Sequence, residues 1–198
     1  MKTYTIQRKP TQLDWDTIPA LNIDTALWGT QTDIIAKAQL CYDEAALYVR
    51  LSAVESEIRA EENGPLGSPC QDSCLEFFFA PLPTDKRYFN VEFNPVGCLY
   101  LGYGSDRYDL VRLLPEKAPI VPQIQRTEEG WNICYCIPFA FIRQFFPEFA
   151  PVSGGSIQAN FYKCGDNTSN PHYLCWNPIT QAQPDYHLRQ YFGNLIFA

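Results

Sequence analysis

Carboxylate and amide side chains recur at alternate positions in three apolar segments of the chain. They are Glu76 in CLEFFFA, Asn90 and Glu92 in YFNVEFN, and Asn160 in SIQANFYKC. Such groups donate and accept hydrogen bonds in pairs, which suits the neighbouring hydroxyls of a sugar. Aromatic rings nearby would supply a stacking surface for the C–H face of a sugar ring. A ligand-binding face is therefore one hypothesis, and an ordinary solvated face of an antiparallel sheet is the other.

Glu76 and Glu92 also permit a catalytic hypothesis. A retaining glycosidase uses two carboxyl groups about 5–5.5 Å apart, one as the acid and the other as the nucleophile. Carboxylates that alternate along strands are common, and the sequence does not fix their separation. Glycoside hydrolysis by this pair is kept as the alternative to non-catalytic binding.

Most of the chain alternates between apolar and polar residues, as half-buried strands do. Within 74–80, Leu75, Phe77 and Phe79 share one face, and Glu76 points to the other. The segments 88–94 and 156–164 repeat this division. We therefore expect one face of each strand to pack on the core and the other to carry the polar groups.

Ten segments with turn signals between them are predicted as strands or extended connections. They are 36–42, 46–54, 74–80, 88–94, 98–103, 113–123 (an edge strand or connection with three prolines), 130–138, 156–164, 173–177 and 191–197. One short helix is predicted over 138–146, because Pro138 suits a first helical turn. The pattern favours a single domain, 1–198, with an all-β fold: a two-sheet antiparallel β-sandwich of immunoglobulin or jelly-roll type.

The composition narrows the classes of partner. Hydrophobic residues make up 46% of the 198 residues, the formal net charge is −7, and no basic run exceeds two residues. This balance argues against a nucleic-acid or anionic-membrane partner. No stretch approaches 18 apolar residues, and the first residues show no apolar core of a signal peptide. We therefore expect a cytoplasmic protein with no membrane partner.

Eight cysteines are present, and reduced thiols are the preferred interpretation for a chain of this length without an export signal. Zinc would favour paired CxxC knuckles or clusters of Cys and His. The sequence offers only the pairs Cys70 with Cys74 and Cys134 with Cys136. Buried thiols that act as small apolar side chains are therefore preferred to structural zinc.

Several motifs, taken together, resemble one known family. They are LNIDTALWGT, CYDEAALYVRLSAVE, DSCLEFFFAP, YFNVEFNPVG, GWNICYCIPF, ANFYKCGD, CWNP, DYH and FGNLIF. In this order and spacing they are similar to the family 9 carbohydrate-binding modules and their standalone relatives, from about Asp24 to Ala198. Each motif alone is weakly specific.

The resemblance implies a β-sandwich that binds a sugar or the end of an oligosaccharide without catalysis. The ligand would lie between two aromatic rings, with hydrogen bonds from amides and carboxylates. Carried over by position, the implied ligand-binding residues are Glu76, Asn90, Glu92, Asn160 and Tyr186.

The second stacking ring of the family falls near Cys70, whose side chain cannot stack. Tyr103, Tyr162 or Trp176 are candidates to replace that ring. Some family members also hold structural calcium. The aspartates available for it are Asp14, Asp16, Asp24 and Asp33, which lack the spacing of an EF-hand. No other cofactor is predicted.

Two further hypotheses stay open. A haem or redox binder would need axial ligands, for which the chain offers Met1, His172 and His187. A protein-interaction module that has lost sugar binding is the other hypothesis. For His187 itself, a hydrogen-bonded structural role is preferred to that of a general base.

The tryptophans are assigned by their surroundings. We predict that Trp28 and Trp131 lie in the core, and that Trp15 lies at the surface.

Overall fold

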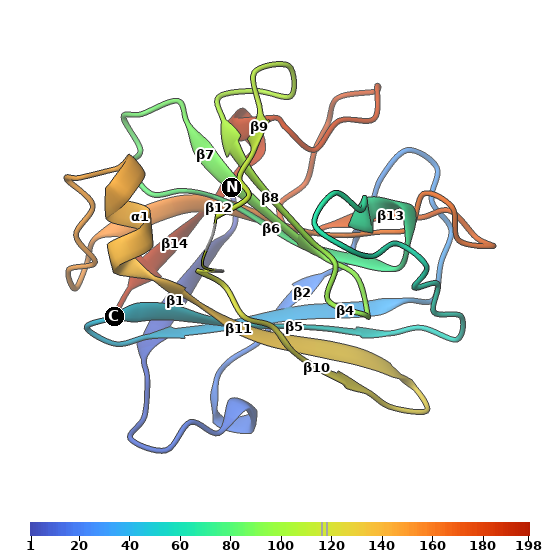
Figure 1. Ribbon diagram of the computed structural model, residues 1–198, viewed down its shortest axis with the longest axis horizontal. Helices are drawn as coiled ribbons and strands as arrows, with labels where there is room; N and C mark the ends of the chain where they lie inside the picture. The colour runs from blue at the N-terminus through green and yellow to red at the C-terminus, as the bar shows by residue number, and fades with distance from the viewer. Residues whose placement is uncertain (116, 118) are drawn as a thin grey trace.

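The computed structural model describes residues 1–115, 117 and 119–198. Within these residues it contains fourteen strands, one α-helix and three short 3-10 helices (Figure 1). The strands are β1 (Thr3–Arg8), β2 (Leu21–Ile23), β3 (Thr25–Ala26), β4 (Ile35–Tyr42), β5 (Ala46–Val54), β6 (Cys74–Ala80), β7 (Tyr88–Phe93), β8 (Leu99–Gly104), β9 (Val111–Arg112), β10 (Gln123–Arg126), β11 (Gly130–Pro138), β12 (Ser156–Cys164), β13 (Tyr173–Cys175) and β14 (Gly193–Phe197). The helices are η1 (Trp15–Thr17), η2 (Pro69–Gln71), α1 (Phe139–Phe145) and η3 (Arg189–Tyr191).

The strands form one mixed sheet in the order β10-β11-β5-β4-β1-β14-β12-β6-β7-β8-β9. In Figure 1 this sheet curls, so that β10, β11, β5 and β4 lie below β6, β7, β8 and β12. The prediction of an all-β fold with one short helix is confirmed. Two separate antiparallel sheets are not what the structure shows, because β1 pairs in parallel with both β14 and β4 and joins the two arms. The partners in a parallel pair lie far apart in the sequence, so no local turn motif indicates that they pair.

The pattern of apolar and polar residues predicted the bounds of most strands and of the helix closely. The predicted strands 46–54, 74–80, 130–138 and 156–164 match β5, β6, β11 and β12. The helix predicted over 138–146 is α1, with Pro138 as its N-cap. The first three strands, β1 to β3, were missed, and two of them span only two or three residues. The extended stretch 113–123 holds positions outside the described residues. The short strand β9 ends just before this stretch, and β10 begins at its last residue.

An apolar core fills the space between the two arms of the curled sheet. On the upper arm, the ring of Phe77 stacks on Phe161 with centroids 4.7 Å apart and on Phe79 at 4.9 Å. On the lower arm, Val49 and Ile133 are fully buried against the same cluster. The predicted apolar faces of β6, β7 and β12 are therefore the core faces.

The opposite face of the upper arm is covered as well. Every residue of β6 and β7 is buried. A second apolar cluster lies on that side, in which Phe78 and Tyr88 of the sheet pack against Ile179 and Phe192 of the C-terminal segment. Of the two hypotheses for this face, the ordinary solvated face is therefore excluded, because residues far along the chain fold over it.

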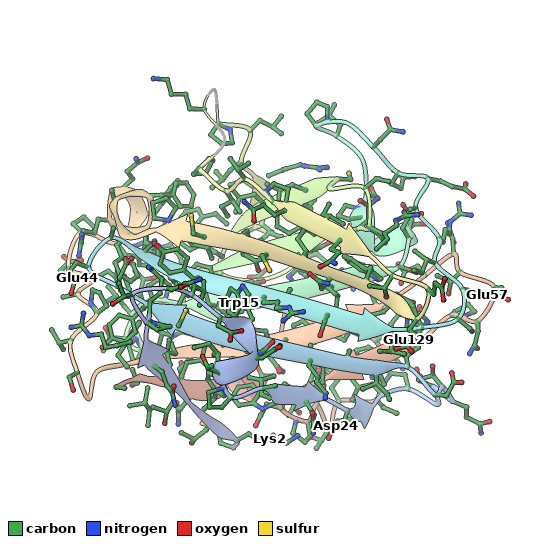
Figure 2. The ribbon with its side chains drawn as sticks, turned by 90° about the horizontal axis from the view of Figure 1, so that it is seen from below. Lys2, Trp15, Asp24, Glu44, Glu57 and Glu129 are labelled. Carbon is green, nitrogen blue, oxygen red and sulfur yellow. The ribbon has the colours of Figure 1, made fainter. Side chains whose placement is uncertain are left out.

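The outer face of the lower arm carries polar groups. Figure 2 shows this side, with Trp15 lying over the strands. The amide of Gln39 donates to the backbone carbonyl of Trp15 at 2.6 Å, and Trp15 is partly buried. Trp131 lies in the core as predicted. No helix among the described residues has the length and apolar character needed to cross a membrane.

Replacement of Phe77 by alanine tests the position of the core. Phe77 is fully buried between two stacked rings, so Phe77→Ala is expected to lower the free energy of unfolding by about 3–5 kcal/mol. Leu66 is 71% exposed, and Leu66→Ala is the control, with an expected change within about 0.5 kcal/mol. Urea unfolding followed by tryptophan fluorescence measures both. Equal changes in the free energy of unfolding for the two substitutions would contradict the placement of Phe77 in the core.

Candidate functional site

A cleft of about 270 Å³ opens beside the covered face of β6 and β7. Its lining mixes aromatic rings, carboxyl groups, thiols and one guanidinium. The lining residues are Trp28, Cys70, Glu76, Phe78, Glu92, Arg107, Cys164, Asp166, Tyr173, Pro184, Asp185, Tyr186 and His187. Of the five predicted ligand-binding residues, Glu76, Glu92 and Tyr186 line this cleft, whereas Asn90 and Asn160 do not.

Glu76 and Glu92 sit opposite each other on β6 and β7 and therefore project from the same face. Glu76 is 2% exposed and Glu92 is 7% exposed. Burial, and next the charge of Glu92, raise the pKa of Glu76 well above its ordinary value. Burial raises the pKa of Glu92 to about 7, against the opposing effects of a hydrogen bond from Asn90 and of the Arg112 charge. A carboxyl group that holds its proton near neutral pH can donate as well as accept a hydrogen bond.

Asn90 positions Glu92 rather than facing the cleft. Its Nδ2 donates to Glu92 Oε1 at 2.8 Å, and its side chain is fully buried. The predicted role of Asn90 in direct ligand contact is not supported by this placement. It acts on the site through the carboxyl group that it holds.

Asn160 is a structural residue. Its Nδ2 donates to the backbone carbonyls of Asn177 and Tyr191, and its Oδ1 accepts from the backbone N–H groups of Phe161 and Asn177. These bonds use both ends of the amide. The prediction that Asn160 binds ligand is corrected, because its polar atoms anchor the C-terminal segment that covers the sheet.

One wall of the cleft is aromatic. Tyr186 stacks on the buried ring of Tyr162, with centroids 4.0 Å apart, and lies 5.3 Å from the ring of Trp28. Tyr173 meets Trp28 edge to face at 5.6 Å. Trp28 has φ +53° and its indole donates to the carbonyl of Gln181 at 2.9 Å, so a tight turn and a long-range bond fix the ring. Trp28 was predicted to be a core residue, but the structure places it on this wall, partly buried.

The position of the second stacking ring is occupied by Cys70, which lines the cleft as the resemblance implied. None of the three candidate replacements faces the cleft. Tyr162 is buried beneath Tyr186, Trp176 packs on Phe161 in the core, and Tyr103 packs on Phe145. Trp28 and Tyr173 are the additional rings that the sequence analysis missed. Trp28 precedes a glycine with φ +83°, which signals a turn, but no local pattern shows that the turn meets Tyr186.

Three charged residues complete the lining and were also missed. Asp166 follows β12, where its backbone N–H donates to the carbonyl of Cys70 at 3.0 Å. Burial raises the pKa of Asp166. Arg107 and Asp185 come from the loops after β8 and before His187. All three lie in loops, where alternation carries no information about side-chain direction.

The strand that carries Glu76 is held at its start by Asp72. Its Oδ2 accepts from the backbone N–H groups of Glu61 and Glu62 and from Asn94 Nδ2, each at 2.8 Å. Asp72 therefore ties the backbone of residues 61 and 62 to the start of β6. These bonds fix the entry of the chain into β6 next to Cys70.

His187 is hydrogen-bonded to Tyr88, with 2.8 Å between Nδ1 and the phenol oxygen. Burial lowers the pKa of His187 to about 4, so the ring is neutral at physiological pH. The structural role predicted for this residue agrees with the bond. His187 also lines the cleft, where a neutral imidazole offers one donor and one acceptor.

The other candidate ligands for metals or haem are dispersed. His172 is buried elsewhere, with Nε2 2.7 Å from Lys163 Nζ, and it does not line the cleft of His187. Asp24 pairs with Lys2 at 3.3 Å, as labelled in Figure 2. Asp14 is the N-cap of η1, Asp16 lies within η1, and Asp33 lines a different cavity. In the described part of the chain these four aspartates form no common ligand group, and calcium stays a prediction.

The depressed pKa of His187 predicts a pH-dependent contribution to stability. The unfolded histidine binds a proton near pH 6.5, whereas the folded one binds it near pH 4, so this contribution is present above pH 6.5 and is lost as the pH falls towards 4. Relative to His187→Gln, the wild type is expected to lose up to about 3 kcal/mol between these pH values. Glu76 and Glu92, whose pKa values are raised, change the free energy of unfolding with pH in the opposite direction. Their contribution is the same in both proteins, so the difference between the proteins reports on His187 alone. Denaturant unfolding over this pH range measures it, and parallel pH profiles of the two proteins would contradict it.

Comparisons with known proteins agree with one another. A search of the curated proteins finds no match. The structure is similar to a proposed carbohydrate-binding protein from Bacteroides uniformis, at 24% identity and TM-score 0.86, covering 100% of this chain and 99% of the other. It is also similar to a family 9 carbohydrate-binding module from Caldicellulosiruptor kristjanssonii, solved with glucose (13% identity, TM-score 0.69, covering 100% and 96%) and with cellotriose (13%, 0.69, covering 99% and 93%).

A model of one protein family decides the classification. The model of carbohydrate-binding family 9 matches residues 7–197, which is nearly the whole chain. This family comprises non-catalytic carbohydrate-binding modules. The chain belongs to carbohydrate-binding family 9.

Proposed function

We propose that the cleft beside β6 and β7 binds the end of a saccharide chain without catalysis. The observation that carries this proposal is the placement of two buried carboxyl groups, Glu76 and Glu92, next to an aromatic wall. Carboxyl groups recognise vicinal hydroxyls, and rings pack on the C–H face of a sugar. The glucose and cellotriose complexes of the Caldicellulosiruptor module support a saccharide as the class of ligand.

The dimensions of the cleft favour a chain end. A volume of about 270 Å³ lies just below the range typical of pockets for small organic ligands. Such a cleft suits one sugar unit and its immediate neighbour rather than a long polymer lying across a flat surface. The covering segment also closes the polar face of the sheet beyond Glu92, where Asn90 and Gly102 are buried or nearly so.

Individual roles follow from the geometry. Glu76 and Glu92 supply hydrogen bonds to hydroxyls, with Asn90 holding Glu92 in place. Tyr186, backed by Tyr162 and flanked by Trp28, supplies the stacking surface. Arg107 and Asp166 add a donor and an acceptor at the rim. Glycoside hydrolysis is not part of the proposal, because the family is non-catalytic.

This arrangement has one aromatic wall, with Cys70 where a second stacking ring was expected. One-sided stacking removes part of the apolar contact on the sugar. We therefore expect weaker affinity than that of a site with two facing rings, and a larger share of the binding energy from the carboxyl groups. The cytoplasmic location expected from the sequence belongs to the same proposal and would restrict the ligands to saccharides found in the cell.

The proposal is tested with Glu76→Gln and Tyr186→Ala. Loss of one strong hydrogen bond or of the stacking ring is expected to weaken saccharide binding by about 10-fold or more. The probes are glucose, cellobiose and cellotriose, measured by saturation-transfer NMR and by titration calorimetry. Matched controls are Glu44→Gln and Tyr108→Ala, since the Glu44 side chain is 87% exposed and Tyr108 is 96% exposed.

The outcomes separate the site from the function. Binding that both site variants lose and both controls retain supports the cleft as the binding site. Binding that survives in both site variants would place the ligand elsewhere. No binding of any of the three saccharides by the wild type would contradict the proposed ligand class and would favour an interaction module. Thermal unfolding of each variant checks that it remains folded.

A further inference from the structure

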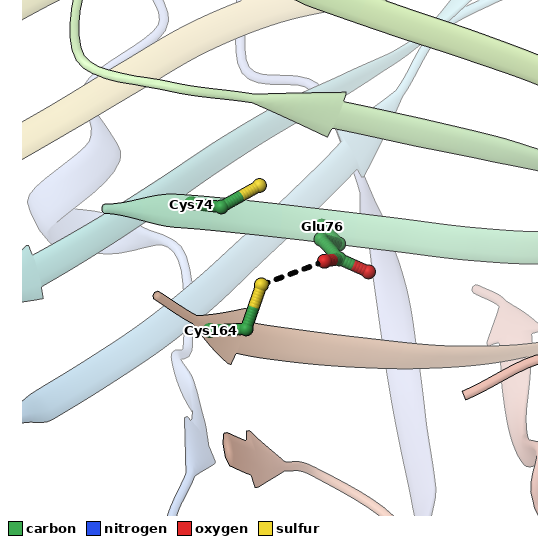
Figure 3. A group of neighbouring side chains, drawn as sticks. All are labelled: Cys74, Glu76 and Cys164. Atoms are coloured by element: carbon green, nitrogen blue, oxygen red, sulfur yellow. Dashed lines mark hydrogen bonds between the residues drawn. The ribbon is translucent and has the colours of Figure 1, made fainter. Parts of the chain in front are cut away.

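Two cysteines and a glutamate come together beside the cleft, which Glu76 and Cys164 line. Cys74 on β6 lies directly opposite Cys164 on β12, and Glu76 follows two residues later on the same face of β6. The Sγ of Cys164 is 3.0 Å from Glu76 Oε1 (Figure 3). One ligand atom from each of the three residues lies within 4.8 Å of the others, and all three side chains are buried.

This donor set has the chemistry of a zinc site. Zinc takes thiolate sulfur at about 2.3 Å and carboxylate oxygen at about 2.0–2.2 Å in tetrahedral geometry. Neighbouring ligand atoms of such a tetrahedron are about 3.5–3.8 Å apart. The Cys164 Sγ to Glu76 Oε1 distance is 3.0 Å, slightly shorter than this edge, and all three ligand atoms lie within 4.8 Å of one another, so small side-chain shifts would bring them to these distances. Calcium and magnesium prefer sets made only of oxygen atoms, so two sulfur donors argue against them.

We propose that Cys74, Glu76 and Cys164 bind one zinc ion that bridges β6 and β12. The three donors come from two paired strands rather than from loops, so the backbone already holds them in place. The proposal does not depend on saccharide binding, because its test contains no sugar and two of its three ligands have no part in the proposed saccharide site.

The fourth coordination position would face the cleft. Glu76 and Cys164 both line it, and so do Cys70 and Glu92. Three protein ligands with one open position are the arrangement of zinc sites that accept an external ligand. The cleft thus provides an entry path for the ion, which a fully enclosed cluster would lack.

The surroundings favour a cation. Among the described residues that line the cleft, the carboxyl groups are Glu76, Glu92, Asp166 and Asp185, and Arg107 is the one guanidinium. A divalent ion would be attracted to the oxygen atoms of these carboxyl groups. Glu76 would then be shared between the metal and the saccharide cleft, which makes the ion a neighbour of the bound sugar.

Cobalt substitution tests the proposal on the intact protein. The chain is reduced, stripped of metal with a chelator and titrated with Co²⁺ in the absence of sugar. We expect one equivalent to produce thiolate-to-cobalt charge-transfer absorption with tetrahedral visible bands, and one equivalent of Zn²⁺ to displace it. Cys74→Ser and Cys164→Ser are expected to abolish this absorption. The matched controls Cys41→Ser and Cys175→Ser, at buried cysteines outside the group, are expected to keep it.

A second measurement needs no variant and covers the case in which a substitution prevents folding. X-ray absorption at the zinc edge of the loaded wild-type protein is expected to show two sulfur neighbours and oxygen neighbours. A first shell of nitrogen and oxygen only would overturn the proposal, as would the absence of a cobalt–thiolate band from the reduced wild type. Cobalt–thiolate absorption as strong in the Cys74→Ser and Cys164→Ser variants as in the wild type would overturn it as well.

Discussion

Every side chain of β6 and β7 is buried, although Glu76 on β6 and Asn90 and Glu92 on β7 carry carboxyl or amide groups. One face of these strands packs on the core, and the other lies beneath the C-terminal segment. Buried polar groups must find partners or lose free energy. Asn160 satisfies this requirement by bonding the covering segment. Asn90 does so only at Nδ2, which donates to Glu92, since its buried Oδ1 has no hydrogen-bond partner among the described residues. The cleft occupies the part of this face that the cover leaves open, which is why the two carboxyl groups retain their capacity for a ligand.

The two arms of the sheet are linked through a buried ion pair. Lys163 Nζ lies 3.0 Å from Glu55 Oε2, and both side chains are almost completely buried. Glu55 follows β5 on the lower arm and accepts a 2.6 Å hydrogen bond from the Trp131 indole, whereas Lys163 belongs to β12 on the upper arm. Breaking such a pair typically costs about 3–5 kcal/mol, because one buried charge is left without a partner. The pair therefore fixes how β12 sits on the core, and β12 in turn carries Cys164 into the cleft on its other face.

Residue alternation was sufficient to predict β6, β7 and β12 and their core faces, because these depend on neighbours in the chain. The same pattern could not show that the polar face is covered. The cover consists of loop residues whose side-chain directions follow no period. Trp28 joins Tyr186 across more than 150 positions of sequence, and a similar long-range pairing places Cys164 beside Glu76. The carried-over amide Asn160 was located correctly on its strand but assigned the wrong partner, since position on a face does not determine which atoms a side chain meets.

The parallel pairing of β1 with β14 places Thr3 beside Asn194 and Ile6 beside Phe197. A ribosome releases the first of these residues long before the last. Until β14 is made, no strand fills the position between β1 and β12, and the nascent chain presents an unfinished sheet edge to its surroundings. The last strand along the chain, β14, thus occupies a position in the middle of the sheet. Cooperative closure of the domain waits for the final strand to leave the exit tunnel, so the C-terminal residues govern when the whole protein becomes folded.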